Sequence, residues 1–187
     1  MTIPAYLPYY VIGGCIAIIV TVLLGLRRAL VRANWPERER AQALRIASLV
    51  MIGWFAGAVG LALLDVYRGA ADRIPTIQYG ILVPILIGTL LIWRSTRGSR
   101  LIDAGPQPWI VGAQLYRALG LIFLVLYAAG QLPGIFAWPA GAGDIAIGLA
   151  APLVALHYGR NGQANGAVAA WNVAGIGDLI VAVATGF

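Results

Sequence analysis

The chain has 187 residues, of which 60% are hydrophobic and 11% are charged. Soluble domains average about 45–50% apolar and about 25% charged residues, so this composition excludes an ordinary soluble protein and indicates an integral membrane protein. The net charge is +6, and all 13 basic residues are arginine. Because arginines of membrane proteins usually set orientation and contact anionic lipid, we expect no nucleic acid partner. The lack of lysine excludes lysine-dependent covalent chemistry.

Six apolar segments follow one another along the chain. Each is long enough to cross a bilayer, which takes about 20 residues. They predict an all-α fold, a polytopic bundle of six transmembrane helices that forms a single transmembrane domain over residues 1–187. The first segment contains Cys15, the one cysteine, so no disulfide forms within the chain. The expected helices are about 6–27, 46–67, 75–93, 109–129, 140–158 and 165–186.

The arginines gather in alternate connections. Ten lie at the connections after the first, third and fifth segments, whereas only Arg68 and Arg73 lie in the others. Cytoplasmic loops of membrane proteins are rich in basic residues. The connections 28–45, 94–108 and 159–164 are therefore expected in the cytoplasm and both termini outside, with the bacterial inner membrane as the location.

Two connections admit more than one interpretation. Residues 27–45 could form an amphipathic hairpin that binds lipid headgroups, or a solvated loop that only sets topology, and we favour the loop. Residues 130–143 contain Pro133 and Pro139. Proline removes a backbone donor and clashes with the preceding helical turn, so no helix is expected to run through this stretch. We expect a surface loop there rather than a re-entrant segment.

Five polar residues lie inside the last three predicted helices. Gln114 and Arg117 are three residues apart and so share one helical face. Arg117 lies about 12 Å along its helix, at 1.5 Å per residue. Asp144 is expected near the start of the next helix, where it could accept hydrogen bonds from the free N–H groups. Asn172 and Asp178 follow in the last helix.

One arginine thus faces two aspartates. A charge at the centre of a membrane helix costs about 2.5–3.5 kcal/mol on insertion scales, and such charges usually pair or line a wet cavity. We therefore expect Arg117 within ion-pair reach of Asp144 or Asp178, with Asp144 the more accessible carboxylate. The pair could be a structural contact that holds the last three helices together. Alternatively, the carboxylate left without a partner could line a polar cavity and take up protons.

The two aspartates stand in similar surroundings. The segments AGAGDIAIGLAA (140–151) and AGIGDLIVAVAT (174–185) align with their aspartates in register. An internal duplication is one explanation. The other is packing, because small residues four positions away, such as Ala140 and Gly148 around Asp144, let two helices approach closely.

Several motifs together resemble a group of small bacterial integral membrane proteins. The resemblance covers about residues 75–187 and implies an architecture but no catalytic residues. It singles out Gln114, Arg117, Asp144, Pro152 and Asn172 at matching positions. The motifs are QLYR (114–117), LPGIF (132–136), GAGDIAIGLAAP (141–152) and WNVAGIGDL (171–179).

The sequence also limits the chemistry of a site. His157 is the one histidine, which excludes bis-histidine haem ligation within the chain. The sequence has no grouping of histidines, cysteines and carboxylates typical of a metal site and no Walker loop. We therefore expect neither a cofactor nor a metal.

Three classes of function remain. The favoured one is a small-solute or proton-linked transporter or channel, its substrate left open, embedded in the lipid bilayer as a homo-oligomer or in a membrane complex. The second is a non-catalytic membrane subunit or interaction protein whose Arg–Asp pair is structural. The third, an intramembrane lipid-modifying enzyme, is disfavoured because the few serines lie at helix ends. A cavity that reaches Asp144 would favour transport, and a dry, fully paired site would favour the subunit.

Overall fold

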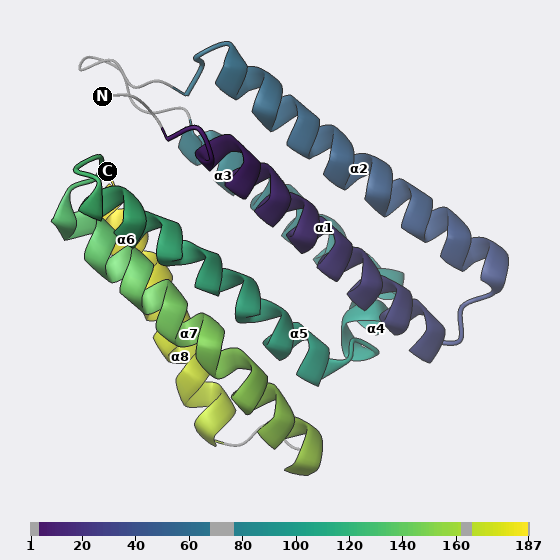
Figure 1. Cartoon of the computed structure of the whole chain (residues 1–187). Helices are drawn as coiled ribbons and strands as arrows, with labels where there is room; N and C mark the ends of the chain where they lie inside the picture. The colour runs from purple at the N-terminus through teal and green to yellow at the C-terminus, as the bar shows by residue number, and fades with distance from the viewer. Residues whose placement is uncertain (1–3, 68–76, 162–165, 187) are drawn as a thin grey trace. The chain divides into compact units, whose positions relative to one another are not determined.

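The computed structural model describes residues 4–67, 77–161 and 166–186, and every regular element in these ranges is a helix (Figure 1). The prediction of an all-α fold is therefore confirmed. Within these ranges, five helical segments are long and apolar enough to cross a membrane. The chain divides into two compact units, which we call unit 1 (Met1–Thr21 with Pro106–Phe187) and unit 2 (Val22–Gly105).

Helix α1 (Leu7–Arg32) begins in unit 1 and ends in unit 2, where a four-residue turn leads to α2 (Glu37–Leu63). The turn is possible because Asn34 adopts a left-handed conformation with φ of 53°, which asparagine tolerates better than most residues. The N–H of Trp35 donates to the carbonyl of the buried Leu30 at 3.2 Å.

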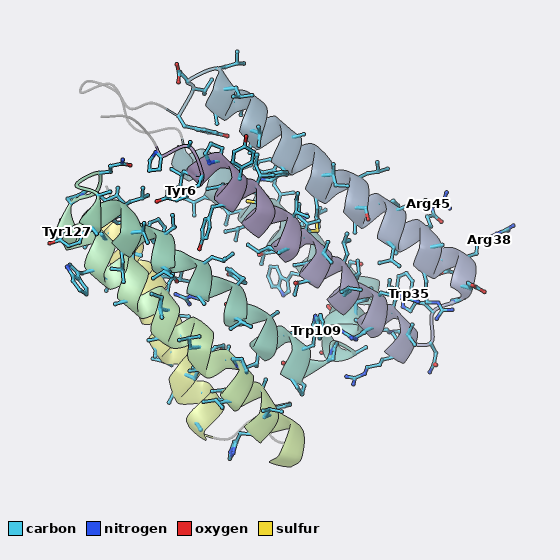
Figure 2. All side chains as sticks on the ribbon, viewed as in Figure 1. Tyr6, Trp35, Arg38, Arg45, Trp109 and Tyr127 are labelled. Atoms are coloured by element: carbon cyan, nitrogen blue, oxygen red, sulfur yellow. The ribbon has the colours of Figure 1, made fainter. Side chains whose placement is uncertain are left out.

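The expected loop over 27–45 is therefore wrong, because the chain is helical on both sides of residues 33–36. Two acidic side chains in the first turn of α2, Glu37 and Glu39, favour an early helix start since they face the positive end of the helix dipole. Arg38 and Arg45 consequently project from α2 rather than from a loop (Figure 2).

Unit 2 continues with α3 (Ile77–Arg94) and a short helix α4 (Thr96–Asp103) that packs against it. The hydroxyl of Ser95 accepts a hydrogen bond from the N–H of Gly98 at 3.1 Å, which is the usual N-cap geometry. The connection 94–108 is thus partly helical instead of an open loop. The start of the predicted helix 75–93 and the connection containing Arg68 and Arg73 lie outside the described residues.

In unit 1, the predicted helix 109–129 is a continuous helical segment of 22 residues, Gln107–Ala128. Its middle is wound more tightly than expected. Helix α5 (Gln107–Ala113) passes into the 3₁₀-helix η1 (Gln114–Gly120), and α6 (Leu121–Ala128) follows at once. A 3₁₀ run of seven residues is long, since such runs rarely exceed about four residues.

Helix α6 ends in a Schellman turn. Gly130 has a φ of +70°, which glycine adopts without steric cost. Its N–H donates to the carbonyl of Tyr127 at 2.9 Å, and the N–H of Gln131 donates to that of Leu126 at 2.9 Å. These two bonds satisfy carbonyls that the helix end would otherwise leave without partners.

Helix α7 (Gly134–Asn161) begins directly after this turn. Pro133 accepts at its carbonyl from the N–H groups of Phe136 and Ala137 at 3.2 and 3.0 Å, so it stands at the start of the helix. Pro139 lies inside α7. The expected loop over 130–143 is therefore wrong: α7 begins at Gly134, directly after Pro133, and continues through Pro139 without the one backbone hydrogen bond that this proline cannot donate.

Helix α7 is the central element of unit 1 and packs against α5, η1, α6 and α8 (Gly166–Gly186). Most of its buried side chains are small, which lets the helices approach closely. The ring edge of Phe123 meets Phe136 at 5.2 Å between centroids and joins α6 to α7. The first half of α1 is bound to η1, because the hydroxyl of Tyr10 donates to the carbonyl of Leu119 at 2.6 Å. The buried residues of this core are Val111, Ala137, Ala140, Ala151, Ala155 and Val168.

Candidate functional site

The centre of unit 1 contains the guanidinium of Arg117, which projects from η1 and is only 5% exposed. Its Nε donates to Oδ1 of Asp144 in α7 at 2.7 Å, and its Nη2 donates to Oδ2 of Asp178 in α8. The remaining nitrogen, Nη1, donates to the carbonyl of Gly175 at 3.1 Å. Each guanidinium nitrogen therefore has a partner, as a buried cation requires.

We call Arg117, Asp144 and Asp178 the ion cluster. The expected ion pair is present with both aspartates rather than with one, so the alternative in which one carboxylate has no ionic partner is wrong. The side chain of Asp144 is 21% exposed and that of Asp178 is 12% exposed. Asp144 is thus the more accessible carboxylate, as expected.

The expected helix-cap role of Asp144 is also wrong. Because α7 begins at Gly134, Asp144 lies ten residues into the helix, well beyond the first turn. The N–H groups near it are therefore used within the helix. Asp144 is held by Arg117 instead.

Glycines on the neighbouring helices make room for the ion cluster. A Cβ on Gly120 would lie 2.6 Å from the Cβ of Asp144, and one on Gly143 would overlap the carboxylate of Asp178. Each aspartate therefore faces a glycine on the preceding helix. A Cβ on Gly148 would lie 2.5 Å from the backbone nitrogen of Ala118, so α7 and η1 touch backbone to backbone there.

The other two predicted polar residues do not join the ion cluster. Gln114 and Asn172 line a pocket of about 420 Å³ between α5, η1, α7 and α8. Gln114 lies one 3₁₀ turn before Arg117, and Asn172 is exposed. The five residues expected in one polar site thus form two neighbouring groups.

Two features of these sites escaped sequence reasoning. The carbonyl of Gly175 binds Arg117, but a backbone acceptor carries no side-chain signal. Trp171 lines the pocket, and its indole N–H donates to the carbonyl of Ile147 at 3.2 Å, which joins α8 to α7. The Trp-Asn motif marked this position without indicating the contact.

The chemistry available to the ion cluster is that of one cation between two anions. Within residues 4–67, 77–161 and 166–186, no group of three or more His, Cys, Asp or Glu residues is placed to hold a metal ion. The cluster can join three helical segments by charge-assisted hydrogen bonds, which are roughly twice as strong as neutral ones.

Comparisons with known proteins identify the family of the chain. No curated protein and no solved structure matches the chain. The family model described as a domain of unknown function (DUF8737) matches residues 74–187, which include the whole ion cluster and the whole pocket, and the chain belongs to this family.

Proposed function

We propose that the chain is a non-catalytic integral membrane subunit whose ion cluster is a structural element that holds its last helices together. One observation carries this proposal: each of the three nitrogens of the buried Arg117 guanidinium donates to an acceptor in α7 or α8. All three nitrogens of Arg117 are held by acceptors within the bundle, which is the arrangement expected of a structural contact between helices. This pairing therefore favours a non-catalytic membrane subunit over a transporter or a lipid-modifying enzyme.

The membrane arrangement is part of the same proposal. Six crossings follow if α3, whose apolar part Leu82–Arg94 is short, spans the bilayer with α1, α2, the segment Gln107–Ala128, α7 and α8. The arginine-rich connections then lie in the cytoplasm of a bacterial cell and both termini lie outside. Trp109 and Tyr127 lie at opposite ends of the helical segment Gln107–Ala128 (Figure 2), which suits the aromatic belts at the two membrane interfaces.

The orientation is tested by labelling single cysteines in a Cys15→Ala background. Pro133→Cys lies in the turn before α7, and Glu39→Cys lies at the start of α2; both positions are exposed. In intact cells, a membrane-impermeant maleimide is expected to label Pro133→Cys and not Glu39→Cys, and permeabilised cells should label both. The reverse pattern would mean that the proposed orientation is wrong.

Proton-linked transport of a small solute is the second candidate, and one observation favours it. The ion cluster has two carboxylates for one guanidinium, and the side chain of Asp144 keeps 21% of its surface exposed. A carboxylate that the surrounding helices do not fully cover is suited to proton uptake. The two candidates differ in whether protons cross the membrane at this site.

Proton flux into liposomes that contain the purified full chain and a trapped pH-sensitive dye distinguishes the candidates. For a structural cluster, the wild-type protein should acidify liposomes no faster than Asp144→Asn, Asp178→Asn or protein-free liposomes. Transport instead requires flux that Asp178→Asn abolishes and Asp144→Asn weakens. The exposed carboxylate of α4 supplies a matched control, Asp103→Asn, which should leave any flux unchanged.

A further inference from the structure

The pocket lined by Gln114 and Asn172 has a defined place in unit 1. Helices α5 and α8 begin and α7 ends at the same end of the unit, opposite the C-terminus (Figure 1). The pocket lies toward that end, because its lining includes Gln107 at the start of α5 and Tyr158 near the end of α7. It reaches inward to Gln114, about 10 Å from Gln107 at 1.5 Å per residue.

The lining combines hydrogen-bonding groups with apolar surface. Three carboxamides, from Gln107, Gln114 and Asn172, each offer donors and an acceptor, and Tyr158 adds a hydroxyl. The indole of Trp171 is oriented by its bond to Ile147 and offers an apolar ring, beside three branched aliphatic side chains. None of these lining residues is acidic or basic.

This lining selects against charged ligands. A charge that leaves water needs a counter-charge or several hydrogen bonds, and the lining residues that the structure describes supply no counter-charge.

We propose that this pocket binds a small uncharged molecule with a flat apolar body and an amide- or carbonyl-type polar edge. The carboxamides pair with the polar edge, and Trp171 with the aliphatic side chains contacts the body. The pocket volume of about 420 Å³ lies in the lower part of the range of small-molecule sites, which suits a ligand of one or two rings. This inference goes beyond the structural role of the ion cluster and does not depend on it.

Isothermal titration calorimetry on the purified full chain in detergent tests the inference with 2-naphthamide as the probe. We expect saturable binding of 2-naphthamide. We expect binding at least tenfold weaker for 2-naphthoate and for 2-naphthylmethylammonium, which have the same ring system but carry a charge. Asn172→Leu and Gln114→Leu should each weaken 2-naphthamide binding by about tenfold, the effect of one hydrogen bond lost in a pocket.

Gln42→Leu is the matched control, because it removes an exposed carboxamide from α2 in unit 2; its affinity should equal that of the wild type. If Gln114→Leu does not fold because of its closeness to Arg117, Asn172→Leu decides the test, since Asn172 is exposed. No saturable binding of 2-naphthamide would overturn the inference. Equal affinity for a charged probe, or wild-type affinity in Asn172→Leu, would overturn it as well.

Discussion

Replacement of Arg117 by leucine is expected to lower the free energy of unfolding by about 3–5 kcal/mol, the usual cost of leaving a buried charge without its partner. The variant Arg117→Leu leaves Asp144 and Asp178 next to each other with no cation between them. It also removes the donor to the carbonyl of Gly175, so α7 and α8 both lose their bond to η1. Denaturation in mixed micelles, followed by circular dichroism, measures the loss.

Compensating changes identify the source of this loss. Adding Asp144→Asn and Asp178→Asn together to Arg117→Leu should restore part of the stability, because both uncompensated charges disappear, and either change alone should restore less. Arg100→Leu removes an exposed arginine from α4 and should change stability by less than about 0.5 kcal/mol. Full rescue by one Asp→Asn change would mean that the other carboxylate is not part of the cluster.

The second large effect is expected from Gly148→Ala. The added Cβ would lie 2.5 Å from the backbone nitrogen of Ala118, and a backbone cannot rotate away as a side chain can. Helix α7 must therefore move off η1, which also stretches the bond between Arg117 and Asp144. Overpacking of this kind costs about 1–3 kcal/mol, measured by the same denaturation experiment.

Gly177→Ala is the matched control for this prediction. Gly177 is the neighbour of Asp178 in α8, yet a Cβ there would meet no atom within 4 Å. Alanine is favoured over glycine inside a helix by roughly 0.5–1 kcal/mol, so Gly177→Ala should keep or raise the stability. Equal effects of Gly148→Ala and Gly177→Ala would contradict the backbone contact between α7 and η1.

The sequence predicted the helical fold and the ion pair because both follow from residue types and their order along the chain. Long apolar runs must be helical in lipid, and a buried arginine must find an acid. The partner of Arg117 was left open between two aspartates because spacing along two helices does not determine their rotation about each other. The structure brings both aspartates to the same guanidinium.

The errors concern places where short-range chemistry overrides a general rule. Pro139 suggested a break, but Pro133 already starts α7 and the helix continues through Pro139. The resulting early start of α7 moved Asp144 from a helix end to the helix interior. Gln114 and Arg117 were assigned to one site from α-helical spacing. In the structure they lie one turn apart in the 3₁₀-helix η1, where Gln114 lines the pocket and Arg117 belongs to the ion cluster.

The winding of η1 has a geometric consequence for α6, the helix that follows it. A 3₁₀-helix turns about 120° per residue and rises about 2.0 Å, against about 100° and about 1.5 Å in an α-helix. Over the seven residues of η1, α6 is therefore rotated by about 140° and displaced along the helix axis by about 3.5 Å relative to an uninterrupted α-helix. Phe123 meets Phe136 in this rotated register. Because Arg117 lies in the middle of η1 and is bound on three sides, the ion cluster sets which face of α6 turns toward α7 and which toward lipid.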